Sequence, residues 1–261
     1  MKEYIIKVVS YKRPSNNTCN LLLNTDFNWQ VFVYSFDPYF DEYVKNYGEH
    51  VRPITEFDKA NLAKKRQLVL DTTINEGYGY CIMLDDDIES IEFIDYPSRE
   101  TTQSSLEDAV LYLIKKILEN HKYVALSASY NASSDKSNKD VEDYKNICNN
   151  SIFNMYEYKQ LKVKYNSESK CEDMEFTMDL ILAGALVGRL KKLCMHNILQ
   201  GGTTDDGLSY RFANTNRFVE EATYMINRYP EYKEVFEYDE QHFKMNTSKL
   251  KKLLKGCKNE N

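Results

Sequence analysis

The segment over residues 80–93, YCIMLDDDIESIEF, most narrowly limits how this chain can fold. A run of apolar residues ends at three consecutive aspartates, Asp85, Asp86 and Asp87, and apolar residues resume after them. A short apolar run of this kind predicts a buried strand. Because the three carboxylates repel one another, we expect a partner for them at the carboxyl end of that strand, where open α/β sheets bind ligands.

The spacing of the three aspartates indicates what that partner is. Alternation along the strand predicts that Asp85 and Asp87 point to one side and Asp86 to the other. Two carboxylates on one side of a rigid element can share a divalent cation, and Mg²⁺ or Mn²⁺ takes one or two carboxylates together with substrate phosphates. The alternative is a helix N-cap or a turn, since both favour aspartate. Three aspartates directly after a buried strand favour the metal site.

The chain as a whole has the size and composition of a globular protein. It has 261 residues, of which 42% are hydrophobic, and these are enough for a sizeable core. We expect a single domain with its core over about residues 1–215 and a helical C-terminal extension over about residues 216–261. The sequence has no uncharged apolar run of about 18 residues and no signal-peptide pattern, so we expect no membrane segment. The six cysteines contain no C-x-x-C pair, which predicts free thiols in a reducing cytoplasm.

Strand and helix patterns alternate over the first half of the chain. β-Rich segments predict strands at residues 4–11, 29–36, 80–84 and 122–129. Between these segments lie helical patterns at residues 18–23, 37–48, 58–77 and 105–121. Asp58 is the expected N-cap of the third helix, and Gly77 is its expected end. This alternation predicts an α/β fold with a mainly parallel central sheet that helices flank.

The second half of the chain is less regular. Apolar and aromatic residues predict strands at residues 151–158 and 161–166. Residues 172–184 predict a helix with acidic residues in its first turn, and further helices are expected from residue 217 onward. Residues 131–150 are polar and predict a long surface loop. The glycine-rich residues 201–207, which include Asp205 and Asp206, are either a lid or an ordinary turn.

Several of these stretches together resemble a known family. An apolar strand followed by Asp-x-Asp and an apolar residue resembles the hallmark of the GT-A glycosyltransferases, which use nucleotide-sugar donors. VVSYKRPSN resembles their first strand and loop, ANLAKKRQLVL the helix before the Asp-x-Asp strand, and CEDMEFTMDLILAG their later ED motif. The resemblance covers about residues 1–190 and implies a GT-A, Rossmann-like fold.

A narrower resemblance concerns the acceptor. YKRPSN, NLAKKRQ, MLDDDI and EDMEF together resemble the dioxygenase-associated, base J-type DNA glycosyltransferases and their phage relatives. The resemblance implies transfer of a sugar from a UDP-sugar to 5-hydroxymethylpyrimidine in double-stranded DNA. It also implies a cytoplasmic protein, in the host cytoplasm if a phage encodes it. The sequence does not specify the oligomeric state.

The resemblance assigns roles to the carboxylates. Asp85 is expected near the donor ribose or sugar and on the metal, Asp87 is the expected metal ligand, and Asp86 assists either. The Mn²⁺ or Mg²⁺ would stabilise the nucleoside diphosphate as it leaves. Asp173, or else Glu172, is expected to take the proton from the acceptor hydroxyl, which an inverting enzyme requires. The alternative for both is simple capping, since carboxylates are favoured in the first turn of a helix.

Polar residues before the aspartate strand are expected to bind the donor by resemblance. They are Ser10, Tyr11, Arg13, Asn61, Lys65 and Arg66. Tyr11 would stack on uracil, Arg13 would reach a phosphate, and Arg66 would hold either a phosphate or a pyrimidine edge. The alternatives are an ordinary strand-to-loop junction and a solvated helix face. His196 is the expected third metal ligand, with a packed or surface histidine as its alternative.

Other functions stay open. The acidic pI of about 5.4 favours a glycan, protein or small-molecule acceptor over DNA. Against this, basic residues at 159–170 and in the C-terminal KLKKLLKGCK offer a local surface for phosphate. A nucleotidyltransferase would use similar carboxylates with a nucleoside triphosphate, and a binding module would keep the site without catalysis.

Overall fold

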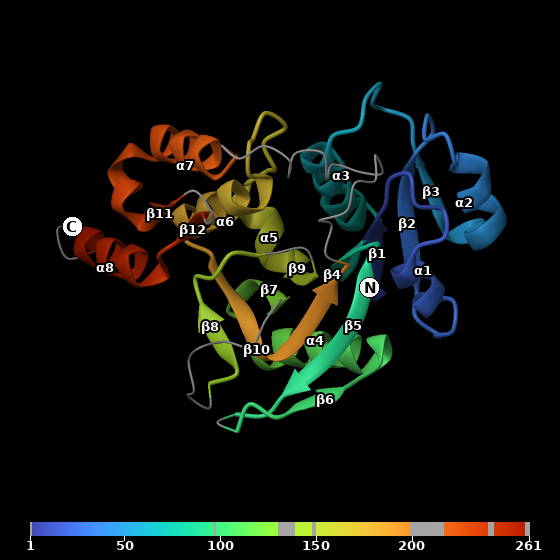
Figure 1. Ribbon diagram of the computed structural model, residues 1–261, viewed down its shortest axis with the longest axis horizontal. Helices are drawn as coiled ribbons and strands as arrows, with labels where there is room; N and C mark the ends of the chain where they lie inside the picture. The colour runs from blue at the N-terminus through green and yellow to red at the C-terminus, as the bar shows by residue number, and fades with distance from the viewer. Residues whose placement is uncertain are drawn as a thin grey trace.

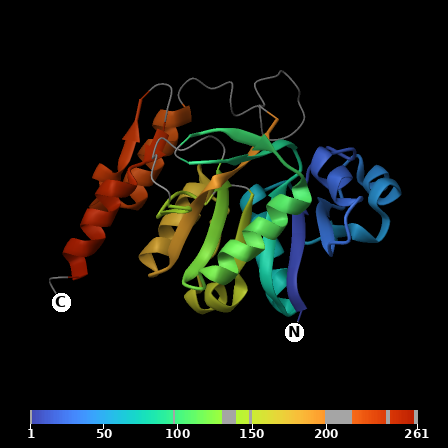
Figure 2. The same ribbon diagram turned by 90° about the horizontal axis from the view of Figure 1, so that it is seen from below.

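The computed structural model describes residues 2–96, 98–129, 139–147, 150–198, 217–239 and 243–258. Within these residues, ten strands form one large sheet with helices on both of its faces (Figures 1 and 2). The α/β architecture predicted from the alternation of patterns is therefore confirmed. The loop predicted at residues 201–207 and half of the loop predicted at 131–150 lie outside the described residues, and in the described half Val141–Asp143 form a short strand that was not predicted.

The sheet has a parallel half and a mixed half. Strands β3, β2, β1 and β4 are neighbours in that order and run parallel, as predicted for the first part of the chain. Beyond β4 the order continues β9, β7, β10, β5 and β6, with antiparallel pairs except for β7 with β10, and β8 pairs with β10. The ten strands are β1 (Lys2–Val9), β2 (Trp29–Tyr34), β3 (Val51–Ile54), β4 (Tyr78–Asp85), β5 (Ile88–Ile94), β6 (Thr101–Gln103), β7 (Tyr123–Ser129), β8 (Val141–Asp143), β9 (Ser151–Asn154) and β10 (Leu186–Asn197).

Helices cover both faces of this sheet and create two apolar cores. One core includes residues of α1 (Asn17–Leu22), α2 (Phe40–Tyr47) and α4 (Leu106–Glu119). The other includes residues of α3 (Leu62–Asn75), α5 (Met155–Leu161), α6 (Glu172–Leu182), α7 (Arg217–Arg228) and α8 (Thr247–Lys258). Because side chains alternate along β4, Cys81 enters one core and Ile82 the other. Burial on both faces explains the continuous apolar run before the aspartates.

The start of α3 corrects one prediction. Asn61, rather than Asp58, is the N-cap, and its side chain accepts a hydrogen bond from the backbone of Lys64 at 2.9 Å. Asn61 has the extended backbone that an N-cap requires, with φ −150° and ψ 115°. The predicted end at Gly77 is confirmed by its positive φ of 78°, a conformation that glycine adopts at little cost.

The second half of the chain departs further from the predictions. The strand predicted at 151–158 is wrong in its second part, because the Asn154 side chain caps α5 through the backbone of Tyr156 and Glu157. The strand predicted at 161–166 is absent from the described structure: Leu161 ends α5, and Lys162 follows with a left-handed φ of 56°. The 12-residue strand β10 was not predicted.

The C-terminal segment is only partly helical. Between α7 and α8 lie a 3-10 helix (Pro230–Val235) and the short antiparallel strands β11 (Phe236–Tyr238) and β12 (Phe243–Met245). Figure 1 shows this segment in orange and red beside α6. The single-domain organisation with a C-terminal extension stays a prediction. Among the described helices, none combines the length and apolar character needed to cross a membrane.

A buried carboxylate holds α7 against α6. Glu175 of α6 is 1% exposed, and it accepts hydrogen bonds from Tyr224 OH at 2.7 Å, Asn166 Nδ2 at 3.0 Å and Arg228 Nε at 3.3 Å. Just beyond α7, Tyr229 OH donates to Asp179 at 2.8 Å. Three donors on one buried carboxylate satisfy the group that burial would otherwise destabilise.

We therefore expect Glu175→Ala to lower the free energy of unfolding by about 1–3 kcal/mol, because three donors lose their acceptor. Urea denaturation followed by circular dichroism measures this change. Glu231→Ala, at an exposed position in the 3-10 helix, is the control and should change stability by less than about 0.5 kcal/mol. Equal effects of the two changes would show that the Glu175 contacts do not stabilise the protein.

Candidate active site

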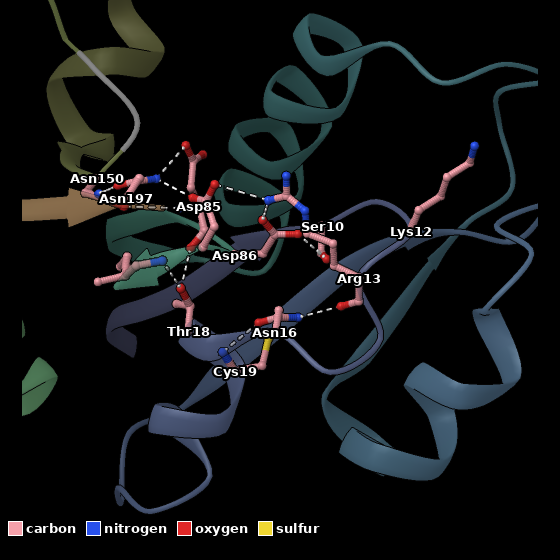
Figure 3. A network of polar contacts seen from close by, with 12 residues as sticks. Ser10, Lys12, Arg13, Asn16, Thr18, Cys19, Asp85, Asp86, Asn150 and Asn197 are labelled. Carbon is pink, nitrogen blue, oxygen red and sulfur yellow. Dashed lines mark hydrogen bonds and ion pairs between the residues drawn. The ribbon is translucent and has the colours of Figure 1, made fainter. Parts of the chain in front are cut away.

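The three aspartates lie where two central strands end side by side. β1 and β4 are parallel neighbours, and Val9 at the end of β1 pairs with Asp85 at the end of β4. Asp86 and Asp87 form the turn into β5, and the loop between β1 and α1 lies next to them (Figure 3). The aspartates therefore occupy the carboxyl edge of the parallel half of the sheet, as predicted.

Asp86 faces the loop that follows β1. It is 6% exposed, and it accepts hydrogen bonds from Ser10 Oγ at 2.6 Å and from Arg13 at 2.8 Å. Ser10 Oγ also lies 2.6 Å from the hydroxyl of Tyr43. Burial raises the pKa of Asp86, while Arg13 opposes that rise. Asp86 thus anchors the loop carrying Ser10 and Arg13.

Asp85 and Asp87 converge on the side-chain amide of Asn197 at the end of β10. Asn197 Nδ2 donates to Asp87 Oδ1 and lies 3.4 Å from Asp85 Oδ2. Asn150 holds this amide in turn, donating to Asn197 Oδ1 at 2.9 Å and accepting from the backbone of Asp85 at 3.2 Å. Figure 3 shows the two asparagines beside Asp85, away from Ser10. Asp85 and Asp87 therefore share a partner, as expected from the sequence, but Asp87 also shares Arg13 with Asp86, because residues 86 and 87 lie in a turn rather than on the strand.

The two asparagines were missed in the sequence. Asn197 adjoins His196, which was the expected third metal ligand, but the structure brings the amide rather than the imidazole to the aspartates. His196 Nε2 instead lies 3.5 Å from Glu92 of β5. Asn150 and Asn197 stand in no recognisable motif, so no signal in the sequence distinguished them from other asparagines.

Arg66 joins the aspartates to the acidic start of α6. This α3 side chain is 4% exposed, and its guanidinium lies 3.5 Å from Asp85 Oδ1 and 3.3 Å from Glu172 Oε1. Burial works against the charged form, but Asp85 and Glu172 outweigh it and raise the pKa of Arg66. The aspartates and the ED pair, far apart in sequence, are therefore parts of one site.

The carboxylates of this site fit a hard divalent cation. Asp85 and Asp87 bring carboxylate oxygens to the same amide, and carboxylate oxygen is the ligand that Mg²⁺ and Mn²⁺ prefer. Burial, with the charges of Asp87 and Asp86, raises the pKa of Asp85 to about 7 against the opposing effect of Arg66. Within the described part of the chain, no group of three or more His, Cys, Asp or Glu side chains is placed to bind a metal ion. A cation here would therefore need further ligands from a substrate, as is usual for Mg²⁺.

Glu172 and Asp173 open α6, and their surroundings differ. Glu172 is paired with Arg66, whereas Asp173 Oδ1 accepts from the backbone of Met174 at 2.8 Å. Burial and then the nearby Glu172 raise the pKa of Asp173, and Arg66 opposes them. The N-cap residue, Cys171, makes no capping hydrogen bond through its side chain. The acidic first turn thus contains one carboxylate that is ion-paired with Arg66 and one whose pKa burial raises.

The remaining expected donor-binding residues lie around the loop after β1. Lys65 is 2% exposed, its Nζ donates to the carbonyl of Ser10, and it lies 4.1 Å from the centre of the Tyr34 ring. Burial lowers the pKa of Lys65 to about 7.

Asn61 and Tyr11 also make contacts within the protein. Asn61 caps α3 and donates to the carbonyl of Ser167 at 3.0 Å. Tyr11 packs edge-on against Tyr34 at 5.8 Å between ring centres. Lys65 and Asn61 therefore support the site's framework, and their contact with a donor stays a prediction.

Comparisons with known proteins identify the family and the fold of this chain. Residues 4–199 match the family described as TET-Associated Glycosyltransferase. S. aureus TarS 1-349 in complex with UDP-GlcNAc is 16% identical with a TM-score of 0.51, over 86% of this chain and 67% of that chain. The mannosyltransferase PcManGT from Pyrobaculum calidifontis, in complex with GDP-Man and Mn²⁺, is 11% identical with a TM-score of 0.57, over 86% of this chain and 64% of that chain. GalNAc-T7 with UDP, GalNAc and Mn²⁺ is 9% identical with a TM-score of 0.51, over 90% of this chain and 50% of that chain.

These likenesses concern the fold. At such low identities they establish a common architecture, which confirms the GT-A fold expected from the sequence. The chain spans between half and about two thirds of the length of these three structures. A comparison with curated proteins finds no match.

The bridging position of Arg66 leads to a stability prediction. Arg66→Leu should lower the free energy of unfolding by about 3–5 kcal/mol, because two carboxylates lose the cation between them. Urea denaturation near neutral pH measures the change. Arg52→Leu is the control: this arginine is half-exposed, lies 3.7 Å from Glu76, and should contribute less than about 1 kcal/mol. A stability loss no larger than that of the control would exclude the bridge as a stabilising element.

Proposed function

Because the chain belongs to the TET-associated glycosyltransferase family, we propose that it transfers a sugar from a UDP-sugar to the hydroxyl of a 5-hydroxymethylpyrimidine in double-stranded DNA. The family establishes a glycosyltransferase, and the donor, metal and acceptor are the proposal. The observation that carries it is the convergence of Asp85 and Asp87 on one amide, beside a helix start that Arg66 ties to them.

In this proposal, Asp85 and Asp87 hold Mn²⁺ or Mg²⁺ and the donor diphosphate lies beside them. A bound metal would neutralise the charge that grows on the diphosphate as the glycosidic bond to phosphate breaks. Asn197 keeps the two carboxylates together, and Arg13, which reaches both Asp86 and Asp87, positions the loop after β1 at the same edge. The Mn²⁺ in the structures of PcManGT and GalNAc-T7 supports the choice of metal.

Asp173 is the proposed general base. Its oxygen accepts the proton of the acceptor hydroxyl while the hydroxyl oxygen bonds to the anomeric carbon, and the bond from that carbon to phosphate oxygen breaks with its electron pair leaving on UDP. Glu172 is ion-paired with Arg66, so Asp173 is the freer base. A base raised in pKa by burial is better matched to neutral pH. Attack opposite the leaving group would invert the anomeric configuration.

The DNA acceptor rests mainly on the family. In the basic C-terminal stretch, Lys249 pairs with Glu237 at 3.0 Å, as the nearby Lys244 does at 3.4 Å, and Lys251 lies over the ring of Tyr144, so these lysines already have partners within the protein. The net charge of −6 favours a glycan, protein or small-molecule acceptor instead. The acceptor that stimulates UDP release distinguishes DNA from these alternatives, and release of pyrophosphate instead of UDP would indicate a nucleotidyltransferase.

We predict that a panel of UDP-sugars with Mn²⁺ gives UDP release from one sugar, and that duplex DNA containing 5-hydroxymethylcytosine stimulates this release. Unmodified duplex is the matched control. DNA binding should weaken steeply as salt rises, because phosphate contacts release counterions. Equal release with both duplexes would contradict the DNA acceptor, and pyrophosphate from a nucleoside triphosphate would indicate a nucleotidyltransferase. NMR of the product's anomeric carbon tests inversion.

We also predict that Asp87→Ala abolishes transfer while the fold is retained, and that chelation with EDTA abolishes transfer by the unchanged protein until Mn²⁺ is restored. Transfer assays and circular dichroism measure the two effects. Asp95→Ala, at an exposed turn after β5, is the control and should leave the rate unchanged. Metal-dependent transfer by Asp87→Ala would exclude Asp87 as a ligand.

A further inference from the structure

Asn146, which the proposed mechanism does not use, contacts the proposed base. It lies on the segment between β8 and β9, and its Nδ2 is 3.1 Å from Asp173 Oδ2. The other carboxylate oxygen, Oδ1, accepts from the backbone of Met174. Each oxygen of Asp173 therefore has one neutral donor, and a carboxylate with about four acceptor sites keeps lone pairs for a further partner.

Thr177 determines which way the Asn146 amide points. This fully buried hydroxyl, one turn after Asp173 in α6, lies 2.8 Å from Asn146 Oδ1 and 2.7 Å from the carbonyl oxygen of Asp173, and it shares its hydrogen between these two acceptors. With Oδ1 facing the hydroxyl, the NH₂ group faces the carboxylate. The reversed amide would place its oxygen against ionised Asp173, which is repulsive.

The backbone around Asn146 is fixed as well. The amide of Ile147 donates to Thr177 Oγ at 3.0 Å, and the amide of Tyr144 donates to the carbonyl of Val187 in β10 at 2.7 Å. Ile147 is itself 2% exposed in the apolar core shared with α6. Asn146 therefore lies on a segment that backbone hydrogen bonds attach to α6 on one side of it and to β10 on the other.

We propose that Asn146, oriented by Thr177, is a positioning residue that holds the carboxylate of Asp173 in the plane and ionisation state needed to accept the proton. Rotation about the last torsion of an aspartate side chain is broad, so the carboxylate plane needs external partners to fix it. Donation to the ionised form also favours that form. The inference rests on the proposed role of Asp173 as the base.

The charged and titratable groups around Asp173 explain why such a donor is needed. Burial disfavours the ionised form, and Glu172 adds a like charge, so both raise the pKa of Asp173. Arg66 opposes them from α3, and among the residues that the structure describes Tyr165 and Cys171 also lie near Asp173. Asn146 adds a hydrogen bond that lowers the pKa without neutralising the base.

The test compares Asn146→Leu and Thr177→Val with the unchanged protein, using UDP-glucose, or the UDP-sugar that the panel selects, and duplex DNA containing 5-hydroxymethylcytosine. We expect kcat to fall by about tenfold in each variant, as for other residues that orient a functional group, with donor KM within about twofold. The acid limb of the rate–pH profile should move to higher pH, because Asp173 loses a donor that favours its ionised form. Thr177→Ser keeps the hydroxyl and should restore most of the rate.

The control is Thr73→Val on α3, and it should leave kcat and the pH profile unchanged. Thr73 is also fully buried, and its hydroxyl donates to the carbonyl of Val69 at 2.7 Å, four residues earlier, as Thr177 does to Asp173. Carbon-13 NMR titration of the aspartate carboxyls, with Asp173 assigned through Asp173→Asn, gives a second measurement that needs no turnover: its pKa should rise in Asn146→Leu.

The outcomes separate the inference from the proposed function. If Asp173→Asn is inactive while Asn146→Leu and Thr177→Val keep the original kcat, pH profile and Asp173 pKa, the positioning role is wrong. If Asp173→Asn keeps full transfer, the assignment of the base is wrong and the inference falls with it. A rate loss in Thr177→Val that Thr177→Ser does not reverse would likewise overturn the role of the hydroxyl.

Discussion

The buried guanidinium of Arg66 is the charge on which the arrangement of this site depends. A fully desolvated cation needs partners, and Asp85 and Glu172 supply them from β4 and α6. Asp85 and Glu172 are in turn stabilised by this cation, because each of them lies near other acidic side chains. A planar guanidinium has donors on several sides and can therefore join two carboxylates that approach from different directions. One side chain of α3 thereby couples the aspartate edge of the sheet to the acidic start of α6.

Around this charged centre, neutral amides orient the carboxylates. Asn197 and Asn150 order Asp85 and Asp87, and Asn146 contacts Asp173. A neutral donor fixes the direction of a carboxylate but leaves its negative charge available to a cation or a proton. Asp85 and Asp87 thus each contact an arginine, which offsets part of their charge, and the amide of Asn197, which orients them without neutralising them.

The sequence predicted those parts of the site that depend on local pattern. The aspartates at the end of a buried apolar run and the acidic first turn of α6 are both local, and both were placed at the correct element ends. β10 was missed because Arg189, Lys191 and Lys192 interrupt its apolar pattern, although Lys191 is fully buried with its ammonium 4.4 Å from the centre of the Tyr96 ring. The asparagines were missed because their roles arise only from contacts between distant segments.

The irregularity near the end of β10 has a consequence for how such a site can change. His196 pairs with Ser90 of β5, but Asn197 pairs with Ile88, so the pairing skips Glu89 between them. Side chains on a strand alternate between faces, and a shift of one residue exchanges the two that face a given point. The extra residue, Glu89, lies on β5, so the position of this bulge, and not only the identity of the residues, helps to place an amide rather than an imidazole beside the aspartates. A shift of this pairing by one residue would replace the neutral donor beside Asp85 and Asp87 without altering any residue of the acidic cluster.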